Sequence, residues 1–104
     1  MFEEFIEELE RIKSQIVELY SPFKIILFGS LAKKCIKSSS DIDICVIVDT
    51  DDKRALVRDM HSKLEEKIPI DIVIYTNEEW ELYHENTSSF LYNICKQGEI
   101  IYGR

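Results

Sequence analysis

Three aspartates stand at the starts of apolar runs, where their carboxylates could hold a metal ion. Asp41 and Asp43 lie two residues apart in Asp41–Val48 (DIDICVIV), so on an extended strand their side chains point to the same face. Carboxylates side by side repel each other and raise each other's pKa, an arrangement that makes most sense with a hard divalent cation between them. Asp71 opens the run Ile70–Tyr75 in the same way, and we expect the three acids to converge.

A Gly-Ser pair marks a second chemical feature, suited to a phosphate group. Gly29-Ser30 stops the apolar run Lys24–Phe28 (KIILF), and the residues that follow, Leu31–Cys35, can form a short helix. Backbone N–H groups at the start of such a helix, together with the Ser30 hydroxyl, are suited to binding an anion. We therefore expect Gly29 and Ser30 to contact a phosphate.

Charge is distributed unevenly along the chain. The formal net charge is −7, which argues against gripping a long nucleic acid, because that requires many Lys and Arg on the phosphates. Within this acidic chain, residues 24–37 hold Lys24, Lys33, Lys34 and Lys37 and no acid, which predicts a local anion site. Lys33 is our candidate for a nucleotide contact, with Lys34 as its alternative.

Hydrophobic periodicity predicts the elements that must position these residues. Apolar residues at three- and four-residue steps indicate amphipathic helices, and short β-branched runs indicate strands. The many glutamates of the first helix are expected to be solvated. In order, we predict a helix at Phe2–Tyr20, a strand at Lys24–Phe28, a short helix at Leu31–Cys35, a strand at Asp41–Val48, a helix at Asp52–Lys67, a strand at Ile70–Tyr75, helices capped by Asn77 and Thr87 that run to about Glu85 and Gln97, and a short edge strand at Glu99–Tyr102.

The order of these elements constrains the sheet. The helix between Asp43 and Asp71 is long enough for a crossover between parallel strands, which would bring these two acids together. For Gly29 to meet the same acids, the first strand must run antiparallel to the second. The sequence therefore predicts an α/β (α+β) fold, a small mixed β-sheet flanked by helices, in a single domain spanning residues 1–104.

Composition narrows the class of protein. Of the 104 residues, 45% are hydrophobic and 32% charged, with three Gly and two Pro, which fits neither a disordered nor a fibrous chain. The first residues lack the features of a signal peptide, and no run reaches membrane-spanning length. Three widely spaced cysteines argue against a disulfide framework or a zinc site. We expect a cytoplasmic protein with no membrane association.

Three motifs with their spacing carry a family resemblance. They are Phe28–Ala32 (FGSLA), Ser40–Asp43 (SDID) and Ile70–Ile72 (IDI). Together they resemble the DNA polymerase β-type nucleotidyltransferase superfamily, and within it the minimal nucleotidyltransferases often paired with a HEPN-domain partner. The likeness runs from about Phe23 to the end of the chain. It implies the nucleotidyltransferase fold.

The resemblance also implies a mechanism with two Mg²⁺ ions and ATP as the substrate. Asp41 and Asp43 would hold both ions, and Asp71 would help to bind the catalytic ion and activate the acceptor hydroxyl. Gly29 and Ser30 would hold the β,γ-phosphates. After the Gly-Ser pair the chain departs from the family pattern, where a basic residue is common; the positive charge would have to come from Lys33 or Lys34.

The function implied by the resemblance is that of an antitoxin. Such a protein transfers AMP from ATP to a hydroxyl, that of a tyrosine, on a partner HEPN toxin and so silences it. Two alternatives remain: a partner-binding module that neutralises a toxin by contact with little turnover, and a small-molecule nucleotidyltransferase. The sequence leaves the oligomeric state open, whether homo- or hetero-oligomer.

Overall fold

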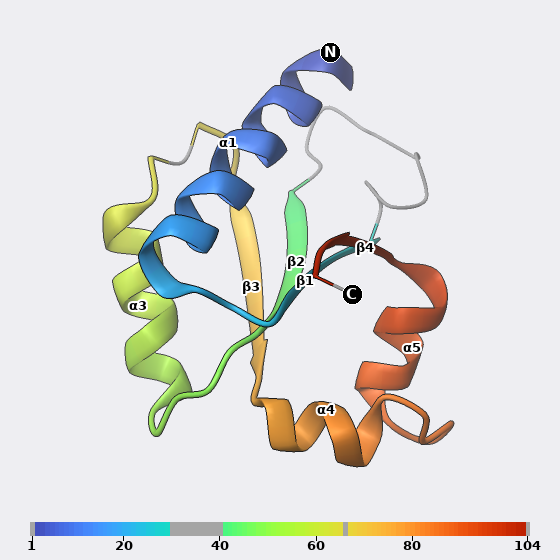
Figure 1. Ribbon diagram of the computed structural model, residues 1–104. Helices are drawn as coiled ribbons and strands as arrows, with labels where there is room; N and C mark the ends of the chain where they lie inside the picture. The colour runs from blue at the N-terminus through green and yellow to red at the C-terminus, as the bar shows by residue number, and fades with distance from the viewer. Residues whose placement is uncertain (1, 30–40, 66, 104) are drawn as a thin grey trace.

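A four-stranded mixed sheet forms the centre of the protein (Figure 1). The computed structural model describes residues 2–29, 41–65 and 67–103. The strand order is β3-β2-β1-β4. Strand β1 is antiparallel to both β2 and β4, whereas β2 and β3 are parallel, so the predicted mixed sheet is confirmed. The strands are β1 (Lys24–Phe28), β2 (Ile42–Ile47), β3 (Ile70–Tyr75) and β4 (Glu99–Tyr102), and β2 lies one residue inside its predicted range at each end.

Helices cover both faces of the sheet, as Figure 1 shows. Helices α1 (Phe2–Tyr20) and α3 (Lys53–Lys63) pack on one face of the sheet, and α5 (Phe90–Gln97) packs on the other. Helix α4 (Asn77–Tyr83) follows the end of β3 on the same side as α5. No helix in the described part of the chain is both long and apolar enough to cross a membrane. The first face buries Phe5, Leu9, Ile12, Ile16, Ile25, Leu27, Ile42, Ile44, Val46, Met60 and Ile74, and the second buries Ile26, Cys45, Ile47, Leu91 and Ile94.

Helix α3 is shorter than predicted. It ends at Lys63 instead of Lys67, because Leu64 adopts an extended conformation (φ −79°, ψ 137°) while its N–H still donates to Met60. The amides of Lys67 and Ile68 donate to a side chain of α1. A longer helix would have used those N–H groups internally, so a tertiary contact ends α3 where the periodicity alone predicts continuation.

The caps of the last two helices also differ from prediction. Thr76 caps α4, accepting a hydrogen bond from the Glu79 N–H at 3.2 Å, and the Glu79 carboxylate returns to the Thr76 N–H at 2.9 Å. Ser89 caps α5 through the Tyr92 N–H. The predicted caps, Asn77 and Thr87, were wrong, since a hydroxyl one or two residues away has the better N-cap geometry. Helix α4 ends at Tyr83, two residues before the predicted end.

The capping box of α4 gives a direct test of this assignment. Replacing Thr76→Val keeps the shape of the side chain and removes the acceptor oxygen, so the free energy of unfolding should fall by about 1 kcal/mol. Thr87→Val is the matched control, because Thr87 is exposed and lies outside any helix, and it should change stability little. Urea denaturation of both variants measures the difference. A larger loss in Thr87→Val would contradict the cap assignment.

Candidate active site

The strand register brings the site residues together across three strands. Phe28 at the end of β1 lies opposite Asp43 of β2, and Asp43 lies beside Asp71 of β3. Gly29 follows Phe28 directly, so the predicted turn and two of the predicted acids meet at one end of the sheet. The antiparallel pairing of β1 with β2 and the parallel pairing of β2 with β3, both expected from the sequence, produce this meeting point.

The alternation of β2 and β3 decides which way the carboxylates face. Ile42 and Ile44 are buried against α1 and α3, so Asp43 between them points to the opposite face. On that face Asp43 is half-buried and Asp71 is exposed. Helix α5 packs mainly on β1, so it leaves Asp71 in contact with solvent. A ligand therefore has access to this carboxylate pair.

Electrostatics shows that the two carboxylates are closely coupled. Desolvation above all, then the negative charge of Asp71, a hydrogen bond with Asp71 and the charge of Asp41 raise the pKa of Asp43 from 3.8 to about 6. With a pKa of about 6, Asp43 is mostly ionised near neutral pH, so the repulsion from Asp71 and Asp41 persists there. A cation bound between these carboxylates would relieve that repulsion.

The donor chemistry of this pair fits a hard divalent cation such as Mg²⁺, which prefers carboxylate oxygens. Asp41 lies just before β2, and its charge acts on Asp43. The three aspartates are not drawn into a single metal-binding cluster: across residues 2–29, 41–65 and 67–103, no three His, Cys, Asp or Glu side chains are so gathered. Metal binding by Asp41, Asp43 and Asp71 together stays a prediction.

Gly29 has a second role that the sequence did not reveal. Its φ of +76° lies in the left-handed region, and a Cβ at this position would stand 2.2 Å from Oδ2 of Asp43. Only glycine lets the turn approach the carboxylate so closely. The glycine thus makes room for the acid, in addition to any contact with a phosphate.

The remaining predicted residues of the phosphate site, Ser30 and Lys33 with its alternative Lys34, lie outside the described residues. Lys24, which the sequence grouped with them, lies at the other end of β1, opposite Ile47. Four residue steps along a strand separate it from Phe28 by about 13 Å, and its Nζ lies 5.2 Å from the centre of the Trp80 ring. Lys24 therefore does not belong to the anion site.

Sequence reasoning missed one charged residue behind the site. Glu8 of α1 was expected to be solvated with its neighbouring glutamates, but only 4% of it is exposed. It lies three residues after Phe5 and four before Ile12, on the apolar stripe of the helix. That position is the signal in the sequence that could have identified it.

The coupled carboxylates predict a pH dependence in metal-free protein. Because the pKa of Asp43 is about 6 when folded and near 3.8 when unfolded, its stabilising effect is complete below about pH 4 and is lost as the pH rises through about 6. Relative to Asp43→Asn, wild-type protein should lose about 1 kcal/mol of unfolding free energy over this range, since solvent screens part of the repulsion.

Urea denaturation in EDTA at about pH 4 and about pH 7 measures this change. Asp51→Asn, at an exposed aspartate before α3, is the control and should run parallel to the wild type. Parallel curves for wild type and Asp43→Asn would contradict the coupling.

Gly29→Ala tests the close approach of the turn to Asp43. The left-handed backbone alone should lower the free energy of unfolding by about 1–2 kcal/mol, and the new methyl group should displace the carboxylate. Gly103→Ala is the matched control, with φ +89° and a similar clash, at 2.3 Å, with the Phe23 carbonyl. Both variants should lose stability, but only Gly29→Ala should change the titration of Asp43 followed by carboxyl NMR. An unchanged Asp43 titration in Gly29→Ala would disprove the contact.

Comparison with solved structures finds the same fold in other proteins. A protein from Sulfolobus solfataricus, whose assignment as a nucleotidyltransferase is itself provisional, superposes with a TM-score of 0.66 and 15% identity, covering 99% of this chain and 84% of the other. A toxin–antitoxin complex solved with AMP-PNP gives a TM-score of 0.59 and 23% identity, covering 91% and 73%. At these identities the likeness concerns the fold.

The sequence itself places the chain in a family. No curated protein matches it significantly, but the sequence profile described as polymerase beta, nucleotidyltransferase, matches residues 10–104. That span includes β1, β2 and β3, and so all of Gly29, Asp41, Asp43 and Asp71. The chain therefore belongs to the polymerase β nucleotidyltransferase family.

Proposed function

We propose that this protein is a Mg²⁺-dependent nucleotidyltransferase that moves AMP from ATP to a tyrosine hydroxyl of a partner toxin of the HEPN type, and so acts as an antitoxin. One observation carries the proposal: the register places Asp43 beside Asp71 and directly against the Gly29 turn. A carboxylate pair next to a turn that can receive phosphates is what transfer of a nucleotidyl group requires.

The proposed reaction is an in-line displacement at the α-phosphorus of ATP. The acceptor oxygen forms a bond to that phosphorus, the bond from the α-phosphorus to the oxygen bridging to the β-phosphate breaks, and pyrophosphate leaves. Asp71, the exposed member of the pair, takes the hydroxyl proton. Gly29 and Ser30 orient the β,γ-phosphates, with Lys33 as a further contact.

Asp41, Asp43 and Asp71 would hold the Mg²⁺ ions in this scheme. When bound, Mg²⁺ makes the attacking hydroxyl more acidic and neutralises charge on the triphosphate. The half-buried Asp43 supplies the fixed negative charge closest to the turn. The raised pKa of Asp43, caused by burial and by the neighbouring acids Asp71 and Asp41, indicates that positive charge bound here would be stabilised.

A protein acceptor is supported by what surrounds the pair. Three grooves in the described part of the chain are lined by residues other than Asp43 and Asp71. The first is lined by Arg11 and Lys67 among others, the second by Trp80 and Tyr102, and the third by Arg54 and Ile74. A partner that docks over the open carboxylates would supply the acceptor itself. A structural neighbour is a toxin–antitoxin complex solved with AMP-PNP, which supports both a toxin partner and an adenine nucleotide.

Mass spectrometry of the partner tests the proposal. The purified chain is incubated with ATP, Mg²⁺ and the protein encoded beside it, and the partner should gain one or more AMP units on a tyrosine. Asp71→Asn should abolish the gain, because it removes the proton acceptor at nearly constant volume, while far-UV circular dichroism stays unchanged. Asp51→Asn, at an exposed aspartate that follows the opposite end of β2 from Asp43, should transfer AMP at the wild-type rate.

Two outcomes would overturn this proposal. If the partner binds tightly and its mass stays unchanged, the chain neutralises it by contact. If a free small molecule or an RNA end becomes labelled instead, the acceptor assignment is wrong and the family chemistry acts on another substrate.

A further inference from the structure

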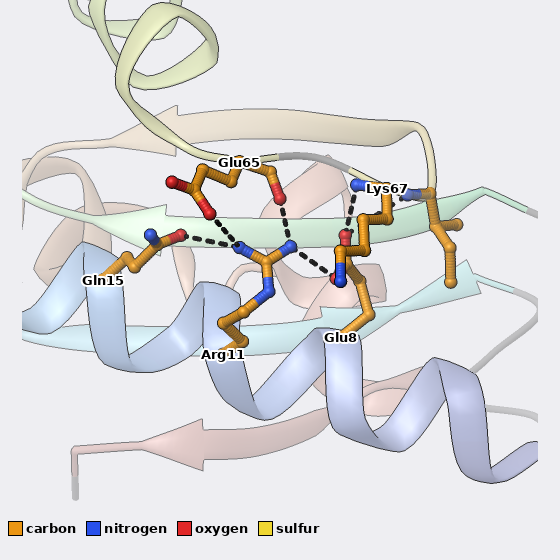
Figure 2. Close-up of polar contacts among 6 residues, drawn as sticks. Glu8, Arg11, Gln15, Glu65 and Lys67 are labelled. Atoms are coloured by element: carbon orange, nitrogen blue, oxygen red, sulfur yellow. Dashed lines mark hydrogen bonds and ion pairs between the residues drawn. The ribbon is translucent and has the colours of Figure 1, made fainter.

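The carboxylate of Glu8 links helix α1 to the loop that leads into β3, as Figure 2 shows. Its Oε2 accepts hydrogen bonds from the backbone N–H of Lys67 at 2.6 Å and of Ile68 at 3.2 Å. Its Oε1 accepts from the Arg11 guanidinium. Both carboxylate oxygens are therefore occupied by donors.

Arg11 extends the same link along the loop. Its guanidinium also donates to the backbone carbonyl of Glu65 and to the side chain of Gln15. One ion pair, between the buried Glu8 and the partly exposed Arg11, thus holds both the carbonyl of Glu65 and the amides of Lys67 and Ile68 (Figure 2). Glu65, Lys67 and Ile68, which lie between α3 and β3, are therefore held against α1 by these side chains.

The charged form of Glu8 is the form that the structure favours. Burial alone would raise the pKa of the Glu8 carboxyl, but the hydrogen bonds from Arg11, Lys67 and Ile68 together outweigh it and lower the pKa. A carboxylate that accepts two backbone N–H groups and a guanidinium is a strong, directional anchor. Glu8 is itself buried, and it lies beside a surface groove that Arg11 and Lys67 also line.

A short, continuous path joins this anchor to the candidate active site. The carbonyl of Pro69, the residue after Ile68, accepts the Ile42 N–H at 2.9 Å. From there the strands pair residue by residue, Ile42 with Ile70 and Asp43 with Asp71. The position of Lys67 and Ile68 therefore determines how the first residues of β3 lie against those of β2.

We propose that Glu8 is a positioning residue for nucleotidyl transfer, which holds the start of β3 so that Asp71 stands at the correct separation from Asp43. The inference rests on the proposed function for the role of Asp71. Glu8 itself is bonded to neither carboxylate; it acts through the amides of Lys67 and Ile68 and the two residues that separate Ile68 from Asp71. Among the described residues, Glu8 bonds only to Arg11 and to the loop that leads into β3. These contacts alone explain its burial, without any feature of the nucleotide site.

Glu8→Gln removes the anchor with little change in volume. A carboxamide has one acceptor oxygen and one donor NH₂ group, so it cannot serve donors on both sides. We expect kcat for AMP transfer to fall by about 10- to 100-fold, the usual effect of losing a group that orients a ligand, while KM for ATP stays unchanged. Mn²⁺ affinity of the protein without nucleotide, measured by electron paramagnetic resonance, should fall by about tenfold.

Coupling to Asp71 is the decisive measurement. In an Asp71→Asn background, Glu8→Gln should cause no further loss of Mn²⁺ affinity, because the carboxylate that it positions is already absent. If Glu8→Gln weakens Mn²⁺ binding equally in both backgrounds, the inference is wrong. This readout needs no acceptor, so it decides the role of Glu8 even if AMP transfer to a toxin is not found.

Tyr20→Phe separates positioning from general stability. The Tyr20 hydroxyl donates to Asp59 at 2.7 Å and ties α1 to α3, so its loss also loosens α1 but leaves the β3 loop anchored. Tyr20→Phe should lower the melting temperature with unchanged kcat and Mn²⁺ affinity. If Glu8→Gln and Tyr20→Phe lose kcat in proportion to their loss of melting temperature, Glu8 contributes to stability alone and the proposal is wrong.

Arg11→Lys provides a milder variant should Glu8→Gln fail to fold. This variant keeps a cation beside Glu8 but loses the planar guanidinium group, which also donates to the Glu65 carbonyl. The kcat should therefore fall less than in Glu8→Gln, again without a change in KM. Glu7→Gln, an exposed charge change one residue before Glu8, should leave kcat at the wild-type value. Wild-type kcat and Mn²⁺ affinity in both Glu8→Gln and Arg11→Lys would overturn the proposal.

Discussion

The repulsion between Asp43 and Asp71, held side by side in register on parallel strands, is the constraint around which this fold is organised. A free chain would separate two such charges, and the folded chain does not. Ile42 and Ile44, on the opposite face of β2, are buried to within 1%, and each contributes about 1.5–3 kcal/mol by leaving water. The free energy gained by burying these two side chains exceeds the repulsion energy of a partly solvated carboxylate pair. The apolar core therefore holds the two acids close together despite their repulsion.

Most of the sheet could be predicted because its signals are local. Lys24–Phe28 and Ile70–Tyr75 are short β-branched and apolar runs with clear ends, and β1 and β3 have those bounds. The direction of the strands followed from requiring Gly29 and the acids to meet. Hydrogen bonds of Thr76 and Ser89, by contrast, depend on how the chain enters each helix, and several hydroxyl or amide residues nearby look equally suitable as caps.

The candidate site was predicted in part for a related reason. Carboxylates two apart in a strand face one way whatever surrounds them, so Asp43 could be placed from the pattern alone. Lys24 could not be placed in this way, because a count of charges along the sequence does not show where each charge lies in space. In the structure Lys24 lies at the end of β1 that is far from the acids. Glu8 was hidden by composition: among so many acids in α1, its position on the apolar stripe was a weak signal, and its partners come from a loop some sixty residues away.

The two cores are completed at different times as the chain is made. Residues for the core under α1 and α3 have all been synthesised once β3 is complete, whereas the second core waits for Leu91 and Ile94 of α5, and β1 gains its second neighbour only with β4. Ribosomes add about 5–20 residues per second, so the nascent sheet spends a few seconds with Ile26, Cys45 and Ile47 uncovered. During that interval the apolar side chains on this face of the sheet and the Cys45 thiol are accessible to chaperones, and the face is covered only after α5 has been synthesised.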